Sequence, residues 1–134
     1  MIVADTNLLI YLTVAGDFTR QAEEVYKKDS QWVAPSLWRS EFRNAMAVYI
    51  RRGLLGLYDA IEKVATAEAV MEGQDFRVDS VRVLALAAES GCSAYDCEFV
   101  ALAQDIGLPL VTAEVELLEK FKPTAVSMRA FCAG

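Results

Sequence analysis

The sequence contains no histidine, and this absence excludes several kinds of catalytic site at once. A Ser-His-Asp or Cys-His site, a histidine general base and a His-Glu-x-x-His zinc site all require the missing imidazole. The three cysteines, Cys92, Cys97 and Cys132, are too scattered to form a tetrahedral zinc site. The phosphate-binding patterns GxxxxGK[ST] and GxGxxG are also missing. Carboxylates, hydroxyls and amides remain for catalysis, and these are the oxygen ligands that Mg²⁺ and Mn²⁺ prefer.

The sequence also lacks any apolar run of the roughly 20 residues that a helix needs to cross a bilayer. The apolar N-terminus has no basic region and reaches Asp5 almost at once, which argues against a signal peptide. An odd number of cysteines without the spacing of a disulfide framework favours a reducing compartment. We therefore expect a cytoplasmic protein with no membrane segment.

A chain of 134 residues, 54% of them hydrophobic, is expected to fold as a single domain over residues 1–134. Its net charge of −6 is unevenly distributed. Residues 1–52 carry seven Lys/Arg and six Asp/Glu, whereas residues 53–134 carry six and thirteen. An acidic total argues against a nucleic-acid-binding protein. A metal site lined with carboxylates would contribute to the same total, so the charge alone decides nothing.

The apolar pattern predicts short strands that alternate with helices. Strands are expected at 1–4, 31–34, 74–78, 109–111 and 125–128, and helices at 8–14, 18–29, 36–52, 57–72, 80–90, 94–106 and 114–121. The expected helix caps are Asp17, Asp79 and Ser93, and glycines end three of the helices. This order indicates an α/β fold with a mostly parallel sheet of four to five short strands. The helices 36–52 and 57–72 form a hairpin.

Acidic and hydroxyl side chains follow the predicted strands at the edge where open parallel sheets bind ligands. Asp5 follows the first strand, and Thr112 and Glu114 follow the fourth. Asp96 lies in the first turn of the helix that leads into that fourth strand. Each acid also has an ordinary structural explanation. Asp5 can cap a helix, Asp96 can belong to a capping box that begins at Ser93, and Glu114 can complement a helix dipole.

Glu41 is harder to explain by structure alone. On the predicted helix 36–52 its neighbours on the same face are mostly apolar, so its carboxylate should face the body of the protein. Burying a carboxylate costs free energy unless the group is paired or binds a cation. A salt bridge with Arg52 is the structural alternative, although that residue lies roughly 16 Å further along the helix. Glu41 is therefore a candidate metal ligand.

Four segments of the chain resemble the PIN-domain family, and within it the VapC-type toxins of prokaryotic toxin–antitoxin pairs. These segments are VADTNLL (3–9), PSLWRSE (35–41), SAYDCEFVALA (93–103) and PLVTAE (109–114). They occur in the family's order and at its spacing along the whole chain. The resemblance implies a three-layer α/β/α fold with a central parallel sheet.

The resemblance also implies a Mg²⁺- or Mn²⁺-dependent endoribonuclease that a VapB-type antitoxin holds inactive. Asp5, Glu41 and Asp96 match the family's acidic cluster. In this interpretation Asp5 and Asp96 hold the metal most directly, and Glu41 binds it through water or orients the attacking water. Glu114 is a fourth catalytic candidate, although most relatives have Asp at this position. Three further residues match polar positions that orient the acids, the backbone or the substrate: Asn7, Ser93 and Thr112.

Elementary electrostatics leads to the same expectation. Carboxylates that are crowded together raise one another's pKa, and a divalent cation relieves this conflict. The cation also lowers the pKa of a bound water, which can then attack a phosphodiester without help from histidine. Together with the resemblance, this predicts hydrolysis of RNA that leaves a 5′-phosphate and a 3′-hydroxyl.

The tip of the predicted hairpin is more apolar than one buried stripe requires. The residues concerned are Tyr49, Ile50, Leu54, Leu55, Leu57 and Tyr58. An exposed apolar patch of this kind is typical of a protein interface. The resemblance implies two uses for it, a homodimer contact and a groove for an amphipathic segment of the antitoxin.

Two other functions remain open at this point. The first is a catalytically impaired PIN-fold module that binds RNA or protein, for which Glu114 is the sequence support. The second is another small Mg²⁺-dependent phosphohydrolase. Metal-dependent cleavage of single-stranded RNA that is lost in Asp5→Asn separates the nuclease from the binding module. Hydrolysis of nucleotides or sugar phosphates, with RNA left intact, would favour the phosphohydrolase.

Overall fold

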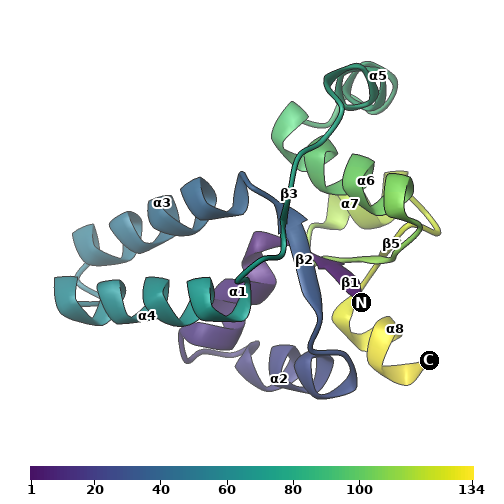
Figure 1. Ribbon diagram of the computed structural model, residues 1–134. Coiled ribbons are helices and arrows are strands. Elements are labelled where there is room, and N and C mark those ends of the chain that lie inside the picture. Colours follow the sequence, from purple (N-terminus) through teal and green to yellow (C-terminus); the bar gives the residue numbers. More distant parts are fainter.

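The structure, a computed structural model, describes residues 1–134 and contains one sheet of five parallel strands (Figure 1). Across the sheet the strands lie in the order β3 (Asp75–Phe76), β2 (Trp32–Pro35), β1 (Ile2–Ala4), β4 (Leu110–Val111) and β5 (Ala125–Val126). The predicted α/β fold with a short-stranded parallel sheet is confirmed. The chain order reverses between β1 and β4, and ligands bind at such a switch point in open parallel sheets.

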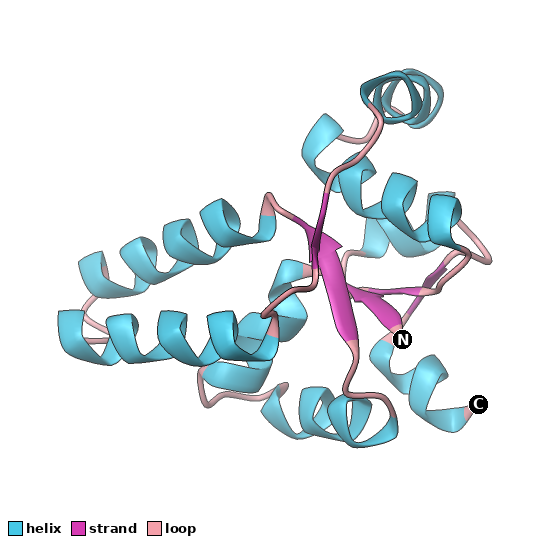
Figure 2. Ribbon diagram, in the orientation of Figure 1, coloured by secondary structure: helices cyan, strands magenta, loops and turns pink.

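Helices cover both faces of the sheet and make a three-layer arrangement (Figure 2). In chain order they are α1 (Thr6–Thr13), α2 (Thr19–Lys28), α3 (Trp38–Arg51), α4 (Leu57–Val70), α5 (Ser80–Ser90), α6 (Ala94–Ile106), α7 (Val115–Lys120) and α8 (Met128–Ala133). On one face α6 packs against β1, β2 and β4, and α5 packs on α6. On the other face α1 packs against β1 and contacts α2, α3 and α4, and α8 packs on α2.

The hairpin of α3 and α4 projects away from the sheet, and one arginine fastens its base (Figure 1). Arg39 donates to Asp75 on β3 at 2.8 Å and to Glu68 on α4 at 2.7 Å. The indole N–H of Trp38 donates to the same Asp75 at 2.9 Å. These bonds hold the start of α3, and hence Glu41, against both α4 and the edge of the sheet.

The helix ends agree with the sequence prediction where a cap and a glycine define them. Asp79 accepts a hydrogen bond from the N–H of Arg82, and α5 ends at Gly91 with φ of 74°. In the same way α6 starts after Ser93 and ends before Gly107, which has φ of 66°. Both glycines adopt the left-handed conformation that a residue with a Cβ rarely takes.

Three local predictions are wrong. Asp17 does not cap α2, because the helix starts after Phe18 and the hydroxyl of Thr19 accepts from the N–H of Gly16. Helix α1 begins at Thr6, earlier than the predicted 8–14, because the polar residues after β1 already belong to its first turn. The predicted strand 125–128 ends at Val126, because the hydroxyl of Ser127 caps a further helix, α8, which starts at Met128. No helix combines the length and apolar character that crossing a bilayer requires.

Candidate active site

Strand pairing places the first two polar side chains of the site beside each other. Ala4 of β1 is in register with Val111 of β4, so the residues that follow them, Asp5 and Thr112, are neighbours. The hydroxyl of Thr112 donates to Oδ2 of Asp5 at 2.6 Å, and both residues are buried. Asp5 occupies the N-cap position of α1, but its side chain makes no capping bond. The alternative explanation, that the Asp5 side chain serves as an ordinary helix cap, therefore has no hydrogen bond to support it.

Thr112 also holds the segment that carries Glu114. Its hydroxyl oxygen accepts from the backbone N–H of Glu114 at 3.0 Å, so its proton is free to point at Asp5. The side-chain amide of Asn7 donates to Oε1 of Glu114 at 3.0 Å. Glu114 stands at the N-cap position of α7 without a capping bond from its side chain. The carboxylate is thus directed toward the start of α1.

Glu41 faces the body of the protein, as its helical position predicted. It lies in the first turn of α3 and is half-buried, and its Oε1 accepts from the hydroxyl of Thr6 at 2.6 Å. The alternative salt bridge with Arg52 does not form. The bond from Thr6 was not predicted, although the sequence signal was available: Thr6 lies between Asp5 and Asn7 in the polar break after the first strand.

Asp96 reaches the site from the start of α6. The oxygen of the Ser93 side chain accepts from the N–H of Asp96 at 3.1 Å, which confirms the hydroxyl half of the predicted capping box. This bond uses the backbone of Asp96, and the Ser93 hydroxyl also lowers the pKa of the Asp96 carboxyl, an effect smaller than that of burial. Ser93 therefore acts on the site by fixing the first turn of α6.

The surroundings of Asp5 strongly disfavour its charged form. The pKa of Asp5 is raised from 3.8 to about 7, chiefly by burial, while the hydrogen bond from Thr112 acts in the opposite direction. Negative charges nearby contribute to this rise; they belong to Glu41, Glu114 and Asp96. All four acids singled out in the sequence therefore lie close enough to act on one another.

The other acids show the same mutual effect. Burial raises the pKa of Glu41, and the charges of Asp96, Glu98 and Glu114 add to the rise. Burial also raises the pKa of Asp96, together with Glu114 and Glu116. Glu98 and Glu116 were not predicted as neighbours of the site. Glu116 is exposed on α7 and belongs to none of the four segments, whereas Glu98 is half-buried on α6 and lies within the segment 93–103.

The chemistry of this donor set fits a divalent cation. Carboxylate oxygens are preferred ligands of Mg²⁺ and Mn²⁺, and a cation would offset the repulsion that raises these pKa values. As the side chains are placed, no three of the His, Cys, Asp and Glu groups meet closely enough to hold an ion. To bind an ion, three carboxylates would have to move closer together. They belong to Asp5, Asp96 and Glu41.

Comparison with known proteins gives consistent matches over nearly the whole chain. The family model described as PIN domain matches residues 2–121. Ribonuclease VapC3 from Pyrobaculum aerophilum is 28% identical over 123 residues, which cover 90% of this chain and 94% of that protein. The crystal structure of PAE2754 from Pyrobaculum aerophilum is similar with a TM-score of 0.78 and 23% identity, over 99% of this chain and 96% of that chain. The structural match shows a shared fold.

Proposed function

The chain belongs to the PIN domain family, and from this membership and its acidic site we propose that it is a Mg²⁺- or Mn²⁺-dependent endoribonuclease, the toxin of a toxin–antitoxin pair. The observation that carries the proposal is a group of four acids from four separate segments, in which Glu41, Asp96 and Glu114 all raise the pKa of the buried Asp5. The resemblance to a protein named a ribonuclease supports RNA as the substrate.

In this mechanism Asp5 and Asp96 would hold the cation directly, and Glu41 would contact it only through a bound water. When bound, it supplies a Lewis acid and lowers the pKa of its water, so that no histidine is needed. The protein's own contribution is to orient the carboxylates. Thr112 fixes Oδ2 of Asp5, and the capped turn of α6 fixes Asp96.

Glu41 is the group that we assign to proton transfer. Its Oε1 is occupied by the hydroxyl of Thr6, so Oε2 is the oxygen that can accept a proton from the attacking water. Burial and nearby carboxylates raise the pKa of Glu41, which improves it as a base. In-line attack on the phosphodiester would then leave a 5′-phosphate and a 3′-hydroxyl.

We further propose that the outer surface of the hairpin binds protein partners. Leu54, Leu57, Tyr58 and Ile61 are all more than half exposed. An apolar groove runs between α3 and α4, and Met46, Ile50, Leu57, Ile61 and Val64 contribute to it. A homodimer contact and an amphipathic segment of the antitoxin are the occupants that the family relation supports.

Nuclease assays with and without divalent cation test the central proposal. We expect Mg²⁺ or Mn²⁺ to permit cleavage of single-stranded RNA and to raise the melting temperature, since the cation binds the folded site. Asp5→Asn, Glu41→Gln and Asp96→Asn should each abolish cleavage while circular dichroism shows a folded protein. Glu89→Gln, an exposed acid on α5, is the matched control and should behave as wild type.

Three outcomes would contradict the proposal. RNA that is bound but never cleaved would favour the impaired binding module. Hydrolysis of nucleotides or sugar phosphates with RNA left intact would favour the phosphohydrolase. An undiminished cation-induced rise in melting temperature in Asp5→Asn/Asp96→Asn would show that the metal binds elsewhere.

A further inference from the structure

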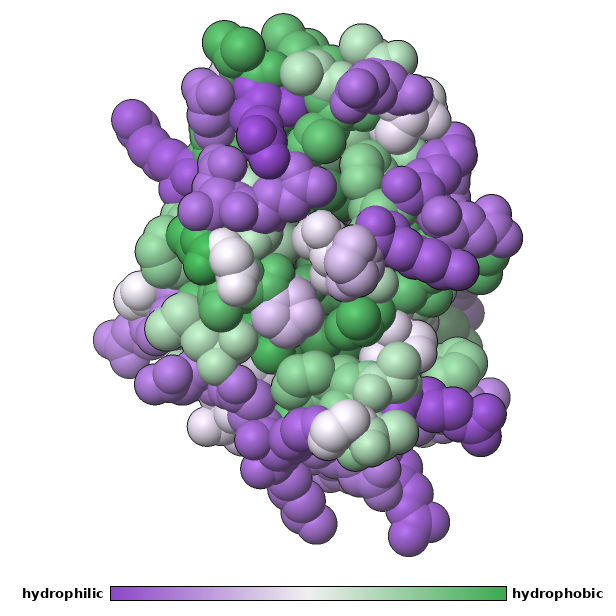
Figure 3. All heavy atoms as spheres, turned by 90° about the vertical axis from the view of Figure 1, so that its right-hand side faces the viewer, coloured by the Kyte–Doolittle hydropathy of each residue, from purple (hydrophilic) through white to green (hydrophobic).

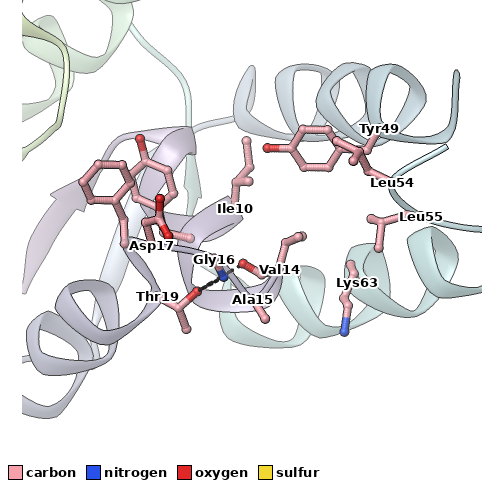
Figure 4. A pocket seen from close by; sticks show the side chains of 12 residues that line it. Ile10, Val14, Ala15, Gly16, Asp17, Thr19, Tyr49, Leu54, Leu55 and Lys63 are labelled. Atoms are coloured by element: carbon pink, nitrogen blue, oxygen red, sulfur yellow. Dashed lines mark hydrogen bonds between the residues drawn. The ribbon is translucent and has the colours of Figure 1, made fainter. Parts of the chain in front are cut away.

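An open pocket lies between the end of α1, the loop that follows it and the tip of the hairpin (Figure 4). It has a volume of about 540 Å³, and eight of the twelve residues that line it are hydrophobic. Three aromatic rings are among them, from Tyr11, Phe18 and Tyr49. The rings of Tyr11 and Phe18 are 5.0 Å apart at an interplanar angle of 40°, and Phe18 is 47% exposed. A flat apolar ligand can therefore reach a ring face directly from solvent.

This aromatic pocket adjoins the acidic site. Tyr11 follows Asn7 by one turn on the same face of α1, and Asn7 is the residue that holds Glu114. The two sites also influence each other electrostatically. Burial raises the pKa of Tyr11, and the negative charges of Asp5 and Glu114 raise it further. One helical turn, about 5.4 Å, is a distance that adjacent groups of a single nucleotide can span.

The polar groups of the pocket are few and are placed at its edges. Figure 4 shows Tyr49 extending from α3 with its hydroxyl directed toward Ile10 of α1. Asp17 lies in the loop after α1, and Lys63 lies on α4 with its ammonium group directed away from Tyr49 and Leu55. A carboxylate accepts hydrogen bonds from exocyclic amino groups of bases, and an ammonium group attracts a phosphate.

We propose that the aromatic pocket binds one unstacked nucleobase of the RNA next to the bond that is cleaved, with Phe18 and Tyr49 as its stacking residues. The inference rests on the proposed ribonuclease function and adds to it a subsite for the substrate. Single-stranded nucleic acid is typically held by aromatic side chains on which its bases stack, whatever the sequence. The pocket's continuity with the acidic site through Tyr11 favours this occupant over a side chain of a partner protein.

Binding of a labelled single-stranded RNA octamer tests the inference. Fluorescence anisotropy is measured in EDTA, where the proposed reaction does not proceed, with the normal octamer and with an abasic octamer that has the same sugar-phosphate backbone. Phe18→Leu and Tyr49→Leu keep an apolar side chain but remove the ring. Phe131→Leu, which removes a partly exposed ring on α8 outside the pocket, is the matched control.

We expect each ring-removing variant to bind the normal octamer about tenfold or more weakly than wild type, the loss that one stacked base produces. The abasic octamer should bind wild type and both variants equally, and Phe131→Leu should bind both RNAs as wild type does. Equal losses on both RNAs, or no loss on the normal one, would overturn the inference. So would ring variants that bind RNA normally but escape inhibition by the antitoxin, because the pocket would then bind protein.

Cleavage of the normal octamer by wild type with Mn²⁺ separates this inference from the proposed function. If wild type cleaves the octamer and the ring variants bind it normally, the nuclease assignment stands and the base subsite is wrong. If wild type neither binds nor cleaves RNA, both are wrong.

Discussion

Three of the four acids of the site are oriented by a hydroxyl or amide group from a neighbouring segment. Thr112 holds Asp5, and Thr6 holds Glu41. Asn7 holds Glu114. Hydrogen bonds to a carboxylate stabilise its charged form, but around Asp5 this effect is smaller than the effect of burial. The site is therefore built at a cost in stability, which a bound cation would offset.

This cost predicts how the stability of the protein depends on pH in the absence of divalent cation. The pKa of Asp5 is 3.8 in the unfolded chain and about 7 in the folded protein, so folding favours the protonated carboxyl. This contribution to the stability of the fold is complete below pH 3.8, and it is lost as the pH rises through about 7. Asn at this position does not titrate. Asp5→Asn should therefore gain stability relative to wild type across this interval, by up to about 4 kcal/mol.

Urea unfolding in EDTA at a series of pH values measures this difference. Glu89→Gln, on the exposed surface of α5, should stay parallel to wild type at every pH. A difference between Asp5→Asn and wild type that does not change with pH would show that the carboxylate is not stabilised in its protonated form.

Glu114 can either take part in the metal site or only stabilise the N-terminus of α7. Two substitutions distinguish these roles. If it takes part in the metal site, Glu114→Gln should weaken the cation-induced rise in melting temperature and lower cleavage, whereas Glu114→Asp should be tolerated. If it only complements α7, Glu114→Gln should cost a few tenths of a kcal/mol in stability and leave activity unchanged. The bond from Asn7 favours the first outcome. Unchanged cleavage in both variants would leave three acids as the catalytic set.

At the scale of elements, the sequence predicts well where local chemistry alone decides the boundary. The limits of α5 and α6 follow from Asp79, Ser93 and the glycines that end them. The start of α2 depends instead on a loop bond between Thr19 and Gly16 that competes with the expected cap. Helix α8 is short and packs on α2, so its formation depends on a contact with a distant segment.

The cap of α6 also predicts an effect on function. Ser93→Ala removes the bond to the N–H of Asp96 and should cost about 1 kcal/mol of folding free energy. It should also lower cleavage, because the first turn of α6 carries Asp96. Ser127→Ala is the matched control: it removes the equivalent cap of α8 and should lower stability without lowering activity. Thermal unfolding and cleavage rates measured on both variants distinguish the two effects, and equal cleavage in both would contradict the positioning role.

At the scale of the molecule, the sheet order gathers residues that are far apart in the chain. Asp5 and Thr112 are 107 positions apart and form a hydrogen bond because β1 and β4 are parallel neighbours. Asp5 and Glu114 could be predicted from their places after strands, Glu41 from its helix face, and all four acids from the resemblance. The polar break after the first strand pointed to Thr6, but its bond to Glu41 and the influence of Glu98 depend on how α1, α3 and α6 face one another.

The exposed apolar side chains of the whole molecule predict self-association and leave two faces as candidates. One is the hairpin surface with Leu57 and Tyr58, which are 56% and 84% exposed. The other, which the sequence analysis did not single out, includes Val81 and Leu84 on α5, 76% and 65% exposed. Figure 3 shows apolar side chains at the top of the molecule, where α5 lies, bordered by charged ones. A polar rim of this kind is typical of a protein interface.

We expect wild type to be a dimer at micromolar concentration, with the hairpin as its interface, because the hairpin's exposed side chains adjoin an apolar groove and those of α5 do not. Leu57→Glu/Tyr58→Glu should produce a monomer in analytical ultracentrifugation, since a carboxylate in an apolar contact must be desolvated without a partner. Leu84→Glu serves as the matched substitution on the other face and should leave the dimer intact. A dimer that survives the hairpin substitutions but dissociates with Leu84→Glu would move the interface to α5, and a monomeric wild type would contradict both placements.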